Sequence, residues 1–155
     1  MEFVQYDSKY RQDFIDLNTA WIKNNFGSLE EEDIKTFQEI DQEIAEGAMI
    51  FFAVENNAVL ATCMTKPIGD GTWELCKMAT EERYQGRGAA SRLFERCMDY
   101  AIANNARRLF ILSNSALKPA LHIYQKYGFQ EIKLDDYQYV RGDIAFEYIV
   151  KSQDV

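Results

Sequence analysis

A loop with two glycines, placed between a strand-like and a helix-like segment, constrains the fold of this chain most. The segment before it, TWELCKMAT at residues 72–80, has the composition of a β-strand. The loop, YQGRG at residues 84–88, holds an arginine between its two glycines. The apolar residues after the loop recur at helical spacing: Ala90, Leu93, Phe94, Cys97, Met98, Ala101 and Ile102. The pattern predicts a strand that leads through a tight turn into a long helix.

Such a turn is typical of an anion-binding site. The first amide groups of a helix have no partner within the helix, and the helix dipole adds positive potential there. Gly86 and Gly88 allow an anion to approach the main chain, because they carry no Cβ. Arg83 and Arg87 add formal charge. A turn that only needed a positive φ would require one glycine, so the second glycine and the arginines favour a phosphate site.

Two common phosphate loops do not fit this sequence. The dinucleotide fingerprint GxGxxG needs a third glycine where Ser91 stands. Its acidic residue is expected where Arg107 and Arg108 lie. The GxxxxGK[ST] loop is absent from the sequence. These absences disfavour a nicotinamide site and exclude a P-loop.

The remaining sequence predicts one domain, residues 1–155, of the α/β (α+β) class. A chain of 155 residues suits a single core, and it contains no repeat or linker-like tract. In the second expected helix, Ile34, Phe37, Ile40 and Ile44 share one face. Strands alternate with helices but hairpins also occur, which predicts a mixed sheet with helices on its faces. The expected strands are 1–6, 48–54, 57–66, 72–80, 107–113, 129–134 and 143–150, and the expected helices are 10–23, 29–47, 89–104 and 119–128.

The charge is distributed unevenly along the chain. The net charge of −8 argues against general nucleic-acid binding. Residues 1–60 hold 13 acidic and 4 basic residues, a balance of −9, so the other 95 residues balance at +1. Six of the eight arginines lie between Arg83 and Arg108. An acidic chain therefore carries a local basic region around the glycine loop.

Neither a membrane segment nor a metal site is expected. The longest apolar run, Ala48–Val54, is too short to span a bilayer, and residues 1–9 do not resemble a secretory signal. We therefore expect a cytoplasmic protein with no membrane partner. Cys63, Cys76 and Cys97 form no CxxC pair and are expected as reduced core thiols. His122, the single histidine, provides no metal site.

Two motifs together resemble a known family. The hexapeptide QGRGAA, residues 85–90, resembles the Q/R-x-x-G-x-G/A pyrophosphate loop of the GCN5-related N-acetyltransferases, the GNAT family. The later segment LHIYQKYGFQE resembles that family's helix ending in Y-x-x-x-G-F, with Tyr124, Gly128 and Phe129 in those places. The order of elements matches over nearly the whole chain, and the ending YVRGDIAFEY resembles a bacterial subgroup of small-molecule type. The resemblance implies a GNAT fold: a mixed, mostly antiparallel sheet of about seven strands flanked by about four helices.

The resemblance also implies roles for individual residues, with acetyl-CoA as co-substrate. Glu74, eleven residues before Gln85, corresponds to the family's catalytic base, and Tyr124 corresponds to its general acid. Leu117 stands where many members have an asparagine, and Asn114 is the nearest substitute. The alternatives are a strand-surface carboxylate for Glu74 and a core aromatic for Tyr124. The implied cofactor contacts are Met78, Ala79, Thr80, Gln85, Gly86, Arg87, Gly88, Ala89, Ala90, Asn114 and Tyr124.

The implied activity is transfer of an acetyl group to the primary amine of a small molecule. Alternatives are a protein lysine or N-terminal acetyltransferase, a CoA-binding module without turnover, and transfer of a longer acyl group. A homodimer is one assembly that the sequence leaves open.

The sequence defines the acceptor site less clearly than the cofactor site. Its implied lining is aromatic, unless these side chains belong to the core or rim: Trp21, Phe26, Tyr137 and Tyr139. Arg141 would bind an acceptor carboxylate or pair with Asp143 or Glu147. The acidic N-terminal part favours a cationic acceptor such as a diamine, polyamine or lysine-like side chain. The alternative is a solvated, screened helix face.

Overall fold

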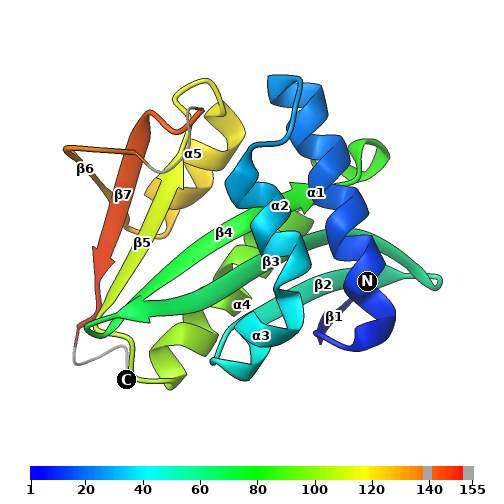
Figure 1. Cartoon of the computed structure of the whole chain (residues 1–155), viewed down its shortest axis with the longest axis horizontal. Coiled ribbons are helices and arrows are strands. Elements are labelled where there is room, and N and C mark those ends of the chain that lie inside the picture. Colours follow the sequence, from blue (N-terminus) through cyan, green and yellow to red (C-terminus); the bar gives the residue numbers. More distant parts are fainter. Residues whose placement is uncertain (138–140, 152–155) are drawn as a thin grey trace.

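A single sheet organises the chain. The computed structural model describes residues 1–137 and 141–151. Within these residues the sheet has seven strands in the order β1-β2-β3-β4-β5-β7-β6 (Figure 1). All neighbouring pairs are antiparallel except β4 and β5. The expected mixed and mostly antiparallel sheet is therefore confirmed. The strands are β1 Glu2–Gln5, β2 Met49–Glu55, β3 Ala58–Gly69, β4 Thr72–Thr80, β5 Arg108–Ser113, β6 Gln130–Ile132 and β7 Ile144–Ile149.

Helices cover both faces of the sheet. Helices α1 to α3 lie on one face, and α4 and α5 lie on the other (Figure 1). The first face buries Phe14, Phe37 and Phe52, while the second buries Leu93 and Phe94. The helices are α1 Arg11–Phe26, α2 Glu31–Gln38, α3 Ile40–Ala45, α4 Ala89–Ala103 and α5 Lys118–Lys126, with 3₁₀ turns η1 at Ser8–Tyr10 and η2 at Glu82–Tyr84.

The helix expected at residues 29–47 is two helices, so the described residues hold five α-helices rather than about four. The break lies at Glu39, whose φ of −110° and ψ of 20° are not helical. No proline or glycine marks this position, so the sequence carried no local signal for it. The expected apolar face was also wrong at Ile34, which is 46% exposed, while Asp33 and Thr36 are buried.

A buried ion cluster explains how α2 is turned. Asp33 has no exposed surface, and its carboxylate accepts hydrogen bonds from Lys77 at 2.5 Å and from both terminal nitrogens of Arg141 at 2.6 and 2.7 Å. The backbone N–H of Glu30 donates to it at 2.8 Å, as part of a capping box. Facing these partners requires Asp33 to point inward, and this turns Ile34 outward. Asp33 therefore joins α2 to β4 and to the segment that begins at residue 141.

The same cluster corrects the expectation for Arg141. Its guanidinium pairs with Asp33 and Glu30 rather than with Asp143 or Glu147. Asp143 accepts hydrogen bonds from the backbone and hydroxyl of Ser115, and Glu147 pairs with Arg108 at 2.7 Å.

Strands β4 and β5 separate soon after they meet. They pair only at Thr72–Arg108, Trp73–Leu109 and Glu74–Phe110. Beyond Glu74, β4 continues beside β3, while β5 continues beside β7. A bulge in β4 accompanies the separation, because the register with β3 shifts there and Lys77 has a φ of 52°. The sheet consequently opens beside residues 76–78.

We predict that Asp33→Asn destabilises the fold at neutral pH by about 3 kcal/mol, because Lys77 and Arg141 lose their buried counter-ion. Burial alone would raise the pKa of Asp33, but hydrogen bonds from Arg141 and Lys77 lower it from 3.8 to about 2. Ionised Asp33 therefore contributes its full share to the free energy of unfolding above about pH 4. That contribution, about 2 kcal/mol, is lost as the pH falls through about 2. Urea unfolding at pH 7 and near pH 2 measures both effects.

Asp41→Asn is the matched control, because Asp41 is 80% exposed in a surface pair with Arg11. Its unfolding midpoint should match that of the wild type. An Asp33→Asn protein as stable as this control at pH 7 would contradict the structural role of the cluster.

Candidate active site

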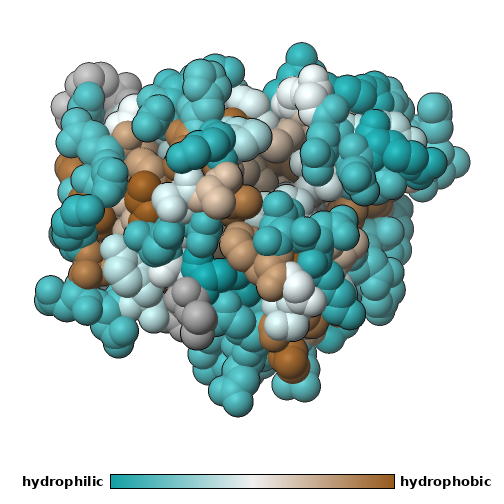
Figure 2. Space-filling model, turned by 90° about the horizontal axis from the view of Figure 1, so that it is seen from above, coloured by the Kyte–Doolittle hydropathy of each residue, from teal (hydrophilic) through white to brown (hydrophobic). Residues whose placement is uncertain are grey.

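A pocket of about 100 Å³ occupies the opening between β4 and β5. Glu74 and Cys76 reach it from the face of the sheet that carries α1 to α3. Leu75 and Tyr124 reach it from the opposite face, which packs on α4 and α5. The pocket therefore passes through the plane of the sheet. Figure 2 views this end of the molecule from above and shows apolar side chains exposed among hydrophilic ones.

Glu74 is a buried carboxylate in the wall of the pocket. It is 8% exposed, and it makes no hydrogen bond or ion pair within residues 1–137 and 141–151. Burial raises its pKa, and the nearby ammonium groups of Lys66 and Lys77 partly oppose that rise. Lys66 stands opposite Glu74 on β3, but its Nζ pairs with Glu43 at 3.4 Å. A carboxylate with a raised pKa and free lone pairs is suited to accept a proton.

Tyr124 faces the pocket from α5. Its ring packs between Phe94 and Phe146, with centroids 5.5 and 5.4 Å away. Its hydroxyl lies 3.5 Å from Oγ of Ser113. Burial raises the pKa of Tyr124 to about 12, although the Ser113 contact opposes this, so the phenol keeps its proton at neutral pH. The pocket thus has a potential proton acceptor on one face of the sheet and a potential donor on the other.

The edge of β4 beyond Glu74 offers main-chain groups to a ligand. Met78 lines the pocket, and Ala79 and Thr80 continue the strand in register with Thr62 and Ala61 of β3. No strand in the described part of the chain pairs with the other edge of these residues. An extended ligand can therefore hydrogen-bond along this edge as an added strand would.

The glycine loop has the geometry of an anion site. Gly86 and Gly88 have φ values of 83° and 82°, which other residues rarely adopt. Gly88 is the N-cap of α4, so no side chain caps the amide groups that begin the helix at Ala89 and Ala90. A Cβ at either glycine would meet no atom within 4 Å, so there is open space above the loop. The N-terminus of a 15-residue helix here faces that space.

The loop arginines are paired with carboxylates. Arg87 pairs with Glu55 at 3.0 Å, and Arg83 pairs with Glu81 at 3.0 Å. Both pairs are solvent-exposed on the arginine side, and such pairs contribute little stability. A polyphosphate can therefore recruit these side chains at small cost.

The sites expected from the sequence divide into three groups in space. Glu74, Met78, Asn114 and Tyr124 line the pocket between β4 and β5. Thr80 and Gln85 line a second hollow, between the loop and α1, together with acidic residues. Ala79, Gly86, Arg87, Gly88, Ala89 and Ala90 line neither.

The remaining expectations concern the pocket rim. The amide of Asn114 donates to the carbonyl of Arg141 and accepts from the N–H of Ala116, so it already supports the adjoining loop. Trp21 and Phe26 line the pocket as expected. Tyr137 is half-buried and is not among the lining residues, Tyr139 lies outside the described residues, and His122 is exposed.

Sequence reasoning missed several pocket residues. Asn18, Lys77 and Ser113 line the pocket, and Asn18 is 1% exposed with its Nδ2 donating to the carbonyl of Phe14. Nothing local in the sequence marks them, because each is placed by the packing of α1, the bulge in β4 or the end of β5.

The described residues contain neither a metal-binding cluster nor a membrane-spanning helix. Over the described part of the chain, no group of three His, Cys, Asp or Glu side chains is placed to hold a metal. Among these residues, none of the helices has the length and apolar character needed to cross a bilayer.

Two curated acetyl-transferring or acetyl-product-forming enzymes, by their names, are similar in sequence to part of this chain. N-acetylaspartate synthetase of Rattus norvegicus is 31% identical over 74 residues, which are 47% of this chain and 24% of that protein. Spermidine N(1)-acetyltransferase of Escherichia coli K12 is 31% identical over 71 residues, which are 45% of this chain and 33% of that protein. The chain thus matches a third or less of the length of these curated relatives.

Solved structures share the fold at low sequence identity. A GNAT acetyltransferase from Staphylococcus aureus Mu50 superposes with a TM-score of 0.87 at 17% identity, covering 97% of this chain and 99% of the other. The PaiA N-acetyltransferase of Thermoplasma acidophilum, solved with coenzyme A, superposes with a TM-score of 0.75 at 13% identity, covering 97% and 100%. The family described as "Acetyltransferase (GNAT) family" matches residues 12–129. The glycine loop, the parted strands and this match over most of the chain together place the protein in the GNAT acetyltransferase family.

Proposed function

We propose that the chain is an acetyl-CoA-dependent N-acetyltransferase that transfers acetyl directly to the primary amine of a small molecule. The observation that carries this proposal is the pocket through the sheet, with Glu74 on one face and Tyr124 on the other. The uncapped start of α4 supports it, because that is where a pyrophosphate would bind. Acetyl-CoA would supply an activated acyl group as a thioester.

The chain's own residues can hold this co-substrate in an extended form. The loop at Gly86–Ala90 would bind the pyrophosphate through backbone N–H groups, with Arg87 released from Glu55 to pair with it. The edge of β4 at Met78–Thr80, which pairs with no strand in the described part of the chain, would bind the pantetheine arm. The opening between β4 and β5 would then admit the thioester.

Glu74 would remove a proton from the incoming amine. An alkylammonium has a pKa of about 10.4 and is not a nucleophile until it loses a proton. Burial raises the pKa of Glu74, which makes it a stronger base than an exposed glutamate. The proton would move to the carboxylate directly or through one water. The freed nitrogen lone pair would attack the carbonyl carbon and form a tetrahedral intermediate. The nitrogen would then lose a second proton to solvent as the bond from that carbon to sulfur breaks and releases the amide.

Tyr124 would donate a proton to the departing sulfur. Because its pKa is raised to about 12, it is protonated throughout the neutral range. A thiol with a pKa of about 8.5 leaves tolerably as an anion, so this donation is less demanding than the removal of the amine proton.

The pocket favours a small acceptor. Its wall on the α1 side is formed by Trp21, Phe26 and Arg141, and Arg141 is fixed by Asp33. The two curated relatives described above are named for small products or substrates, which supports the same class. A test uses a panel of small amines, lysine peptides and N-terminal peptides with acetyl-CoA, read by release of free thiol. Turnover of peptides alone would favour protein acetylation, and no turnover with any acceptor would favour a CoA-binding module.

We predict that Gly88→Glu weakens CoA binding strongly while Gly88→Gln weakens it only moderately. Both side chains force a residue with Cβ into a positive φ, so the backbone strain is shared. Only glutamate places a negative charge at the expected phosphate position. Titration calorimetry with CoA should show at least about a tenfold difference in Kd between the variants, about 1.4 kcal/mol. Equal Kd values in two folded variants would refute the assignment of the loop.

We predict that Glu74→Gln lowers kcat/KM by about a hundredfold, and most strongly at low pH, where free amine is scarce. Tyr124→Phe should lower it by about tenfold with little dependence on pH below 10, because the phenol is protonated over this range. Steady-state profiles between pH 6 and 10 measure both effects. Two profiles that superimpose on the wild type would contradict both roles.

A further inference from the structure

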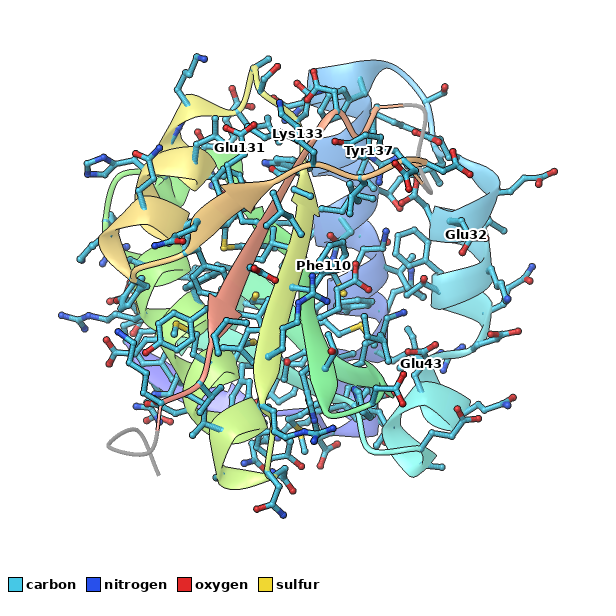
Figure 3. The ribbon with its side chains drawn as sticks, turned by 90° about the vertical axis from the view of Figure 1, so that its left-hand side faces the viewer. Glu32, Glu43, Phe110, Glu131, Lys133 and Tyr137 are labelled. Atoms are coloured by element: carbon cyan, nitrogen blue, oxygen red, sulfur yellow. The ribbon has the colours of Figure 1, made fainter. Side chains whose placement is uncertain are left out.

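Asn18 is a polar residue buried in the wall of the pocket. It lies on α1, and Figure 3 shows this helix (blue) on the same side of the sheet as α2 and α3. Asn18 is 1% exposed, and its Nδ2 donates to the carbonyl of Phe14 at 3.0 Å, one helical turn earlier. A carbonyl oxygen only accepts, so this contact must be made by the nitrogen of the amide. The oxygen Oδ1 consequently faces away from that carbonyl.

The Oδ1 atom of Asn18 opens into the pocket. It accepts no hydrogen bond from any residue among 1–137 and 141–151. Within the same residues, Oγ1 of Thr65 is the one side-chain polar atom that is sealed from solvent and has no partner. Oδ1 is therefore not sealed, and the small accessible surface of Asn18 lies in the pocket that this residue lines. The pocket thus contains a fixed acceptor to which no donor is bound.

A second acceptor of this kind lines the same pocket. The carboxylate of Glu74 is buried and makes no hydrogen bond or ion pair in the described part of the chain. The cationic groups of the wall are engaged elsewhere, because Lys77 and Arg141 both bind Asp33. Buried acceptors without donors cost free energy, and a ligand that supplies the donors removes this cost. A nitrogen that carries several N–H bonds is the complement of such a pair.

The protons of a primary amine match these two acceptors. A primary alkylammonium has three N–H protons. During acetyl transfer one proton goes to Glu74 and a second leaves to solvent as the tetrahedral intermediate breaks down. The third stays on nitrogen in the amide product. Because this proton is never transferred, it can remain hydrogen-bonded to one acceptor from the bound amine to the product.

We propose that Asn18 binds the acceptor amine through this third proton and thereby selects primary over secondary amines. Oδ1 accepts the N–H that survives the reaction, while Glu74 receives a proton that does not, and the freed lone pair is left to face the thioester. A secondary amine loses both of its protons during the reaction, so Oδ1 ends without a donor, and a site with an unmatched polar group rejects such an analogue. This inference rests on the proposed function, because it assigns the specificity of the same site.

The test compares kcat/KM within two pairs of amines, by release of free thiol. The pairs are pentylamine with N-methylpentylamine, and 2-phenylethylamine with its N-methyl derivative. In the wild type the primary amine of each pair should react faster by at least about tenfold. Asn18→Leu keeps the approximate size of the side chain and removes the acceptor. It should slow the primary amine by about tenfold, which corresponds to one hydrogen bond of about 1.4 kcal/mol, and hardly change the N-methyl amine.

The comparison of ratios removes the effect of the added methyl group. Crowding by this methyl is shared by the wild type and the variant, so it cancels when the two ratios are compared. Asn25→Leu is the matched control, because Nδ2 of Asn25 donates to the carbonyl of Trp21 at 2.8 Å, the same contact on the same helix, but the residue is exposed. Its ratio should equal that of the wild type. Asn18→Ala is the second variant, since alanine favours the helix and also removes the acceptor.

The outcomes separate this inference from the proposed function. Asn18 variants that slow both amines of a pair by the same factor would reveal a structural role alone and overturn the inference, with amine acetylation left standing. A wild type that accepts both amines equally, or an Asn25→Leu protein whose ratio falls as far, would overturn it in the same way. Release of thiol with none of the four amines, in a protein that still binds CoA, would overturn small-amine acetylation and this inference together.

Discussion

The separation of β4 and β5 is the constraint on which the rest of this structure depends. Two parallel strands pair at three positions and then diverge, so that one edge of β4 has no partner strand among residues 1–137 and 141–151. An exposed strand edge can pair with another chain and so promote aggregation. In this protein the edge borders a pocket that crosses the sheet. The bulge at Lys77 accompanies this divergence, and the buried carboxylate of Asp33 holds the Lys77 side chain. The opening is therefore built by strand geometry and secured by an ion cluster.

Burial gives the two candidate catalytic residues complementary properties. Glu74 and Tyr124 both have raised pKa values because their environments disfavour the charged form. A raised pKa makes the carboxylate of Glu74 a stronger base. The same change keeps the phenol of Tyr124 protonated at neutral pH. Burial on opposite faces of the sheet thus favours proton acceptance by Glu74 and proton donation by Tyr124.

The acidic N-terminal part has more than one role in the folded chain. Asp33 and Glu30 bind Arg141, Glu55 binds Arg87, and much of the negative charge is used in pairs with bases far along the sequence. The charge balance of a segment is therefore a poor guide to its surface, because it does not show which carboxylates are already paired inside the fold.

The sequence by itself determined the elements and the family, since these depend on local patterns. The helical stripe after the loop and the positive φ of Gly86 and Gly88 follow from nearby residues. Only the tertiary structure decided the break at Glu39, the exposure of Ile34 and the partners of Arg141. It also decided that Glu74 is buried and makes no hydrogen bond or ion pair within residues 1–137 and 141–151. These features depend on contacts between residues as distant as Asp33 and Arg141, 108 positions apart, which no local pattern records.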